Sequence, residues 1–99
     1  MAPIHRAKIH TIDSLAPGAT WRFQWNNPPA GVVAYIAFPN PKTPTGQHGV
    51  THGTVRMGPI TTHRTEDNYN AHEPSYVSFE ITNTGNETTG VDIYQTWVD

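Results

Sequence analysis

Prolines and glycines are spread along the whole chain and leave almost no stretch long enough for a helix. Nine prolines and eight glycines occur in 99 residues, so few windows of about 11–18 residues escape one of them. Proline inside a helix removes a backbone hydrogen bond, and glycine there costs conformational entropy. The apolar residues also show no 3.6-residue period. We therefore expect a chain without long helices.

Side chains alternate instead with a period of two, which is the pattern of a half-buried strand. The segment Thr20–Trp25 places aromatic side chains on one face and polar ones on the other: Trp21, Phe23 and Trp25 against Arg22 and Gln24. The segment Tyr76–Asn83 repeats the pattern, with Val77, Phe79 and Ile81 on its apolar face. A small domain needs its largest side chains in its core. The sequence therefore predicts that the aromatic row of Trp21, Phe23 and Trp25 is buried.

Three further patterns make specific predictions about pairing. Val32–Phe38 is apolar at every position, which predicts a central strand covered on both sides or a strand with a partner on its outer face. Val50–Met57 and Ile60–Arg64 form either a hairpin around Gly58-Pro59 or one strand bent there, and the poor fit of proline to a tight hairpin favours the bend. Tyr76–Asn83 and Val91–Val98 are expected to form a hairpin.

Together with a strand over Ile9–Ile12, these segments give six or seven strands at intervals of about 8–12 residues. This spacing predicts one all-β domain over residues 1–99, an antiparallel β-sandwich. Two stretches, Leu15–Thr20 before an aromatic strand and Phe79–Asn86 before a closing strand, resemble immunoglobulin-like accessory modules of bacterial secreted and surface proteins. With the adjoining strands the resemblance covers about a third of the chain. It implies a fold and transfers no site.

The charge pattern excludes several kinds of partner. Six basic and eight acidic residues give a formal net charge of −2, with no run of either sign. A nucleic-acid partner is not expected, because phosphate binding needs clustered basic residues. Membrane insertion is not expected either, because no apolar stretch approaches the roughly 18–20 residues of a span. The first residues hold no signal peptide, the composition is compatible with secretion, and the compartment stays open.

Six histidines are the one unusual feature of the composition, and four fall in the loop-rich middle: His48, His52, His63 and His72. Imidazole is a common ligand of zinc and copper, so these four are the candidate metal ligands. In the hairpin alternative His63 would lie diagonal to His52 at roughly 7–8 Å. Ordinary solvated histidines are the favoured alternative, because His48 and His52 lie about 13 Å apart on an extended strand. The expected cofactor is therefore none, or zinc or copper.

Aromatic side chains outside the core pattern are the candidate ligand-binding residues. Five are expected in exposed or interfacial positions: Tyr35, Tyr69, Tyr76, Tyr94 and Trp97. Tyr69, Tyr76 and Trp97 are singled out as ligand-binding residues, for a glycan or a protein ligand.

No enzyme motif is found: the chain has no phosphate-binding glycine loop, no Gly-x-Ser-x-Gly and no His-Glu-x-x-His. We therefore expect a non-catalytic binding or assembly module that self-associates and recognises its partner through loops 39–49 and 65–74. A histidine-based zinc or copper protein is the first alternative. A carbohydrate-binding module is the second.

Overall fold

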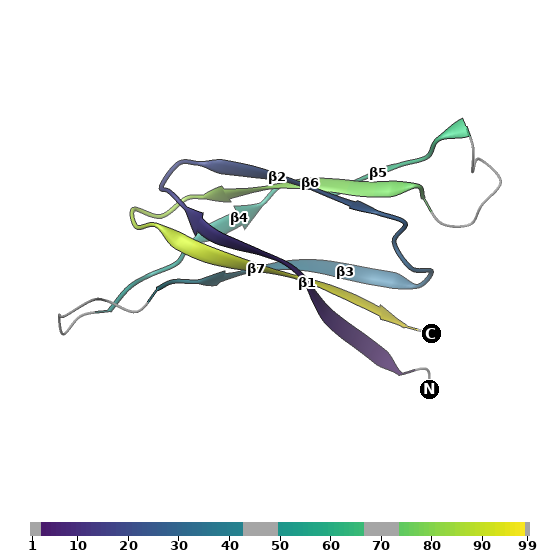
Figure 1. Ribbon diagram of the computed structural model, residues 1–99, viewed down its shortest axis with the longest axis horizontal. Coiled ribbons are helices and arrows are strands. Elements are labelled where there is room, and N and C mark those ends of the chain that lie inside the picture. Colours follow the sequence, from purple (N-terminus) through teal and green to yellow (C-terminus); the bar gives the residue numbers. More distant parts are fainter. Residues whose placement is uncertain (1–2, 43–49, 67–73, 99) are drawn as a thin grey trace.

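Two antiparallel sheets pack face to face in this protein (Figure 1). The computed structural model describes residues 3–42, 50–66 and 74–98. One sheet has the strand order β1-β7-β3, and the other has the order β2-β6-β4, with β5 also paired to β6. The strands are β1 (Ile4–Leu15), β2 (Thr20–Asn26), β3 (Val32–Asn40), β4 (Val55–Met57), β5 (Thr61–His63), β6 (Tyr76–Asn83) and β7 (Thr89–Val98). The predicted all-β sandwich is confirmed, and the described part of the chain contains no helix long and apolar enough to cross a membrane.

The core lies between the sheets and draws one face from each strand that lines it. Phe79 is its centre, with the ring of Phe23 at 5.2 Å and the ring of Tyr35 at 5.6 Å between centroids. The alternation predicted for Tyr76–Asn83 is confirmed, because its apolar members are buried. Within the described ranges, the buried hydrophobic residues are Ile12, Leu15, Phe23, Tyr35, Val77, Phe79, Ile81, Val91 and Ile93.

The expected hairpin between Tyr76–Asn83 and Val91–Val98 is wrong. β6 pairs with β2, β4 and β5, whereas β7 lies between β1 and β3 in the other sheet. The connection from Asn83 to Thr89 therefore crosses from one sheet to the other. The apolar faces of the two strands meet across the core, where each covers the other, and this burial replaces the side-by-side pairing that their adjacency in sequence suggested.

The prediction that Val32–Phe38 forms a central strand covered on both sides is also wrong. This segment belongs to β3, which is an edge strand of its sheet and pairs only with β7 among the described strands. Tyr35 was expected to be exposed or interfacial, but it points inward and is buried. The side chains on the opposite face of β3, Ile36 and Phe38, remain exposed.

β4 and β5 follow the predicted bend. Both pair antiparallel with β6, β4 opposite Asn83–Ile81 and β5 opposite Ser78–Tyr76, so they form one interrupted edge strand. The hairpin alternative is wrong. The interruption falls at Gly58, whose N–H donates to the Glu80 carbonyl at 2.7 Å.

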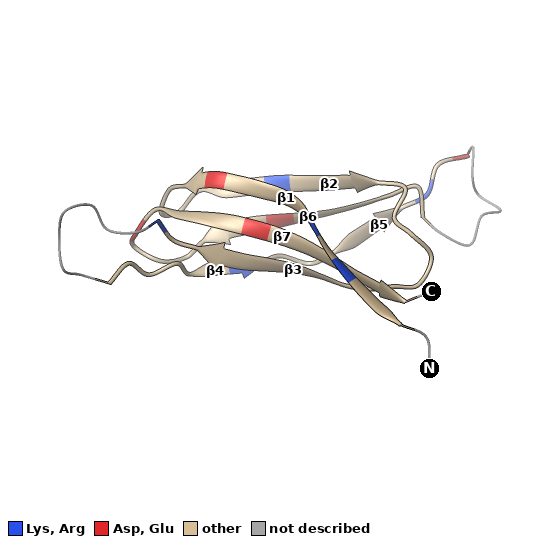
Figure 2. Cartoon of the chain, turned by 60° about the horizontal axis from the view of Figure 1, so that its bottom comes forward, with Lys and Arg blue, Asp and Glu red and all other residues tan. Residues whose placement is uncertain are grey.

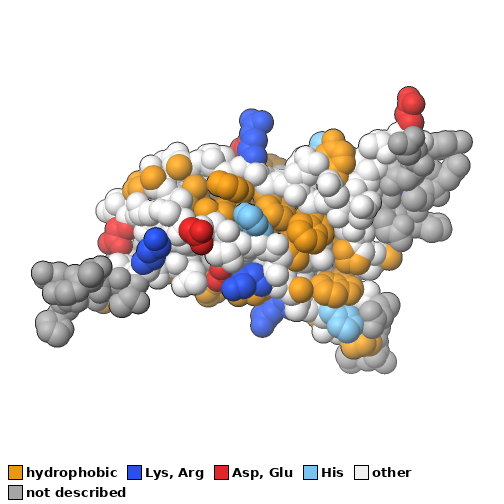
Figure 3. Space-filling model, viewed as in Figure 1, with side chains coloured by type: hydrophobic (Ala, Val, Ile, Leu, Met, Phe, Trp, Pro, Cys, Tyr) orange, Lys and Arg blue, Asp and Glu red, His pale blue; other side chains and the backbone are white. Residues whose placement is uncertain are grey.

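The aromatic row of β2 is only partly buried, contrary to prediction. Phe23 is buried and Trp25 half-buried, but Trp21 keeps 42% of its surface exposed. Trp21 lies where the β1 and β2 edges of the two sheets face each other, and the His10 ring stacks on it at 5.9 Å and contacts Phe23 at 5.6 Å. Figure 3 shows a band of hydrophobic side chains between the sheets on this side. The aromatic row therefore begins inside the core at Phe23 and reaches the edge of the sandwich at Trp21, where the core ends.

Candidate binding sites

The structure separates the two metal-ligand candidates that it describes. His63 ends β5 opposite Tyr76, whereas His52 precedes β4 beyond the other end of β6, where its N–H donates to Glu87 at 2.7 Å. The part of β6 between these ends, Tyr76 to Asn83, spans about 23 Å at about 3.3 Å per residue. Among the described residues no three His, Cys, Asp or Glu side chains converge. His48 and His72 lie outside the described residues, so zinc or copper binding stays a prediction.

One metal candidate and one ligand-binding candidate do meet, on the outer face of the second sheet. The rings of His63 and Tyr76 stack at 4.2 Å, and His63 Nε2 shares a 2.8 Å hydrogen bond with Ser78 Oγ. Beside them is a hollow of about 630 Å³, which we call the polar trough. Its far wall is the ion pair between Arg22 and Glu80, at 3.0 Å. The trough therefore combines neutral hydrogen-bonding groups, one balanced ion pair and an aromatic edge.

The other ligand-binding candidates do not join this trough. Trp97 lies near the end of β7, opposite His5 of β1 and Val32 of β3, and the His5 ring stacks on it at 5.3 Å. Tyr69 lies outside the described residues. The candidates Trp97 and Tyr76 thus occupy different sheets and do not form one site.

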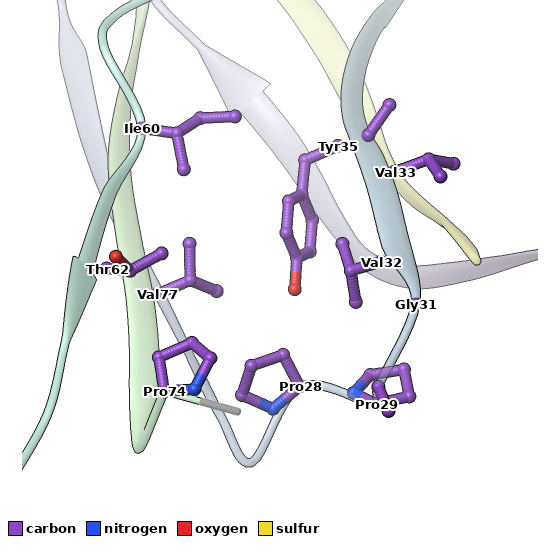
Figure 4. Close-up of a pocket in the computed structure, with 12 residues that line it drawn as sticks. Pro28, Pro29, Gly31, Val32, Val33, Tyr35, Ile60, Thr62, Pro74 and Val77 are labelled. Carbon is purple, nitrogen blue, oxygen red and sulfur yellow. The ribbon is translucent and has the colours of Figure 1, made fainter. Parts of the chain in front are cut away.

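A second hollow, with apolar walls, opens between the sheets on the side of β3 and β5. It has a volume of about 410 Å³, and we call it the apolar cavity. Figure 4 shows Tyr35 and Val32 on the β3 side facing Ile60, Thr62 and Val77 on the other. Prolines form the rim: Pro28, Pro29 and Pro74. Apolar concave sites with a few polar groups are the usual form of small-molecule binding sites.

Tyr35 is the main polar group of the apolar cavity. Its hydroxyl donates a 2.8 Å hydrogen bond to Oε1 of Gln95, which is also buried. Burial raises the pKa of the Tyr35 phenol above its ordinary value, because the protein interior disfavours the anion. The phenol is therefore neutral at physiological pH. Its oxygen donates one hydrogen bond to Gln95 and retains the capacity to accept another.

The rim of the apolar cavity is held by the connection between β2 and β3. Asn27 has a φ of 54°, and its N–H donates to the Ser75 carbonyl at 2.9 Å, which ties the connection to the start of β6. Gly31 has a φ of 80°, and a Cβ there would overlap the Val98 carbonyl oxygen. With Pro28 and Pro29 between these two residues, the backbone has little freedom. The cavity is thus preformed.

The two edges of the first sheet differ in character. β1 carries Arg6, Lys8 and Asp13, and its register with β7 shifts at two places. β3 has no charged residue (Figure 2). Its register with β7 shifts once, between Val32 and Ala34, and is regular from Ala34 to Asn40. Three of its large apolar side chains are exposed: Val33 (62%), Ile36 (39%) and Phe38 (58%). Charges and bulges are features that prevent edge strands from pairing with other chains, and β3 lacks the charges entirely.

The apolar cavity was not found from the sequence. The edge position of β3 was not found either, although a partner on the outer face of Val32–Phe38 was one of the two alternatives predicted. The cavity combines residues of the β2–β3 connection with residues of β5 and β6, and no local pattern brings these together. The all-apolar run Val32–Phe38 was the one available signal for the edge, because a strand with one buried face does not need two apolar faces.

Comparisons of this chain with family models, with curated proteins and with solved structures found no match. The fold and the sites described above are therefore the basis for a functional assignment.

Proposed function

We propose that this chain is a non-catalytic assembly module, in which two copies associate through antiparallel pairing of their β3 strands. The observation that carries the proposal is the contrast between the two edges of one sheet: β1 has charges and two register shifts. β3 is uncharged and apolar on its outer face, and its single register shift lies at its start, between Val32 and Ala34. An edge strand without charges is a template for another strand. Pairing through a two-fold axis gives a closed dimer with a continuous six-stranded sheet.

The outer face of β3 is self-complementary in such a pairing. With the two-fold axis at Ile36, each Ile36 lies opposite its own copy, and each Phe38 lies opposite Ala34 of the second copy. Each Phe38 then has a small side chain opposite it, and the two isoleucines contact each other at the axis. Ala34, Ile36 and Phe38 share one face because alternate residues of β3 pair with alternate residues of β7.

The test is the oligomeric state of the purified chain by sedimentation or light scattering across a dilution series. We expect a dimer for the natural sequence and a monomer for Phe38→Lys and for Ile36→Lys, because a lysine on an edge strand opposes pairing with another chain. In Ile36→Lys two like charges would also lie directly opposite each other at the two-fold axis. The matched control is Ile4→Lys. Ile4 is 72% exposed on the opposite edge strand of the same sheet. Its variant should remain a dimer.

Two results would refute the proposal. One is a natural chain that is monomeric at every concentration. The other is a dimer that Phe38→Lys and Ile4→Lys weaken equally, since that would place the interface away from β3. Circular dichroism shows whether each variant keeps its strand content.

Further parts of the proposal rest on the sequence. Two stretches, Leu15–Thr20 and Phe79–Asn86, resemble immunoglobulin-like accessory modules. We infer that the chain is a sandwich of this kind. Partner recognition through loops 39–49 and 65–74 also stays part of the proposal, although residues 43–49 and 67–73 lie outside the described residues.

Glycan binding is a second candidate function, favoured by the polar trough. Hydroxyl, amide and charged groups of opposite sign line it beside the Tyr76 and His63 rings, a combination suited to the hydroxyls and apolar C–H surfaces of a neutral sugar. A glycan array tests it. Binding that Tyr76→Ala abolishes and Tyr94→Ala preserves supports this function, and an array without any binding refutes it.

A further inference from the structure

We infer that the apolar cavity is a binding site for a compact, mostly apolar, two-ring molecule with a single hydrogen-bond donor. This site goes beyond the proposed assembly role. Phe38 and Ile36 lie on the outer face of β3, whereas the cavity is on the inner side of the same strand, where Tyr35 points.

The size of the apolar cavity sets the size of the ligand. Its volume of about 410 Å³ is well above the roughly 150 Å³ of an apolar protein cavity that binds benzene. A ligand with two fused rings fits this space, with part of it reaching the open mouth. Apart from Tyr35 and Thr62, the side chains of the lining are aliphatic or proline, so most of the ligand surface must be apolar.

The polar groups of the cavity set the chemistry of the ligand. The Tyr35 hydroxyl donates to Gln95, so toward a ligand it acts as an acceptor. Thr62, on the facing wall, is the other hydroxyl in the lining. The cavity lining contains no charged residue, so an ionised ligand would be buried without a counterion. The fitting class is a neutral bicyclic compound that donates one hydrogen bond.

The preformed rim favours binding of a rigid ligand. Asn27 and Gly31 hold positive φ angles, and hydrogen bonds tie the connection to Ser75 and to Val98. A site that is already shaped loses little conformational entropy when it closes on a ligand. A rigid two-ring molecule likewise has few rotatable bonds to immobilise.

The test uses indole as the probe and 1-methylindole as its matched analogue, which has the same rings but no N–H donor. Both are titrated into ¹⁵N-labelled protein while backbone amide signals are followed. We expect saturable shifts confined to residues 30–35, 60–62 and 75–77. Indole should bind about tenfold more tightly than 1-methylindole, the equivalent of one hydrogen bond of about 1.4 kcal/mol.

Two variants locate the site. Ile60 lies on the wall facing Tyr35, and Ile60→Trp should fill the cavity and weaken indole binding by about tenfold or more. Thr62→Phe fills the same wall and replaces Ile60→Trp if that variant does not fold. The control, Val50→Trp, adds the same side chain at a position that is 75% exposed and does not line the cavity, and it should leave binding unchanged.

Three outcomes overturn the inference. These are the absence of saturable shifts, shifts centred elsewhere such as on Trp21, and indole binding that survives both filling variants. Equal affinity for indole and 1-methylindole would overturn the assignment of Tyr35 as the acceptor. The dimer test does not depend on any of these results, so failure of this site and failure of the β3 interface are distinguishable.

Discussion

The buried hydroxyl of Tyr35 donates a 2.8 Å hydrogen bond to Oε1 of Gln95 on the neighbouring strand β7. The two side chains point into the same interior and satisfy each other there. Together they pin the inner face of β3 to the central strand of its sheet, next to the apolar cavity.

Removing this hydroxyl should destabilise the protein without changing its fold. Tyr35→Phe keeps the ring but leaves the buried Gln95 oxygen without its donor, at a cost of about 1–3 kcal/mol. Denaturant unfolding measures the change in the free energy of unfolding. Tyr94→Phe, at a half-buried position on the outer face of the same sheet, is the control, and an equal effect at both positions would contradict the role of the bond.

Stability should also fall at alkaline pH because of Tyr35. Burial raises the pKa of its phenol in the folded state, so the unfolded chain loses this proton first. The contribution of Tyr35 is fully present below the unfolded pKa of about 10 and is lost as pH rises through the higher folded pKa. Between neutral pH and a pH above 10, the free energy of unfolding should therefore decrease less for Tyr35→Phe than for the natural chain. Parallel pH profiles would disprove this.

Asn83 should be among the most sensitive polar positions. It is fully buried at the end of β6, where its Nδ2 donates to the carbonyls of Leu15 and Glu87, at 2.8 and 2.7 Å. Its Oδ1 accepts a bond from the Gly85 N–H at 2.9 Å. Asn83→Ala leaves these three backbone groups unpaired, so we expect a loss of about 3 kcal/mol or more. Asn26→Ala, at an exposed position, should cost far less in the same thermal or denaturant unfolding experiment.

The two aromatic positions Phe79 and Trp21 should respond very differently to truncation. Phe79→Ala removes the centre of the core and should cost about 3–5 kcal/mol. Trp21→Ala removes a side chain that is almost half exposed and should cost only about 1–2 kcal/mol. Equal losses in urea unfolding would show that Trp21 belongs to the core after all.

The inward face was predictable where side chains alternate, because alternation is a local property. It was not predictable for Val32–Phe38, which is apolar at every position, and Tyr35 was wrongly expected to be exposed or interfacial. Val77, Phe79 and Ile81 could be assigned to the interior from their spacing alone, and Phe23 likewise. The assignment of Trp21 failed because spacing gives the face of a side chain and not its distance from the rim. In the candidate site at the polar trough, His63 had been predicted as a metal ligand and Tyr76 as a ligand-binding residue. Only the structure shows that their rings stack.

By itself, then, the sequence determined that this chain forms strands, that β6 has one apolar face, and that two sheets must share a core. The tertiary structure alone decided that β6 and β7 separate into different sheets, that β3 is an edge, and that a cavity opens between β3 and β5. The physical reason is that strand pairing uses backbone hydrogen bonds, which are the same for every residue type except proline. Side chains therefore encode the faces, while the neighbours of each strand follow from packing of the whole chain.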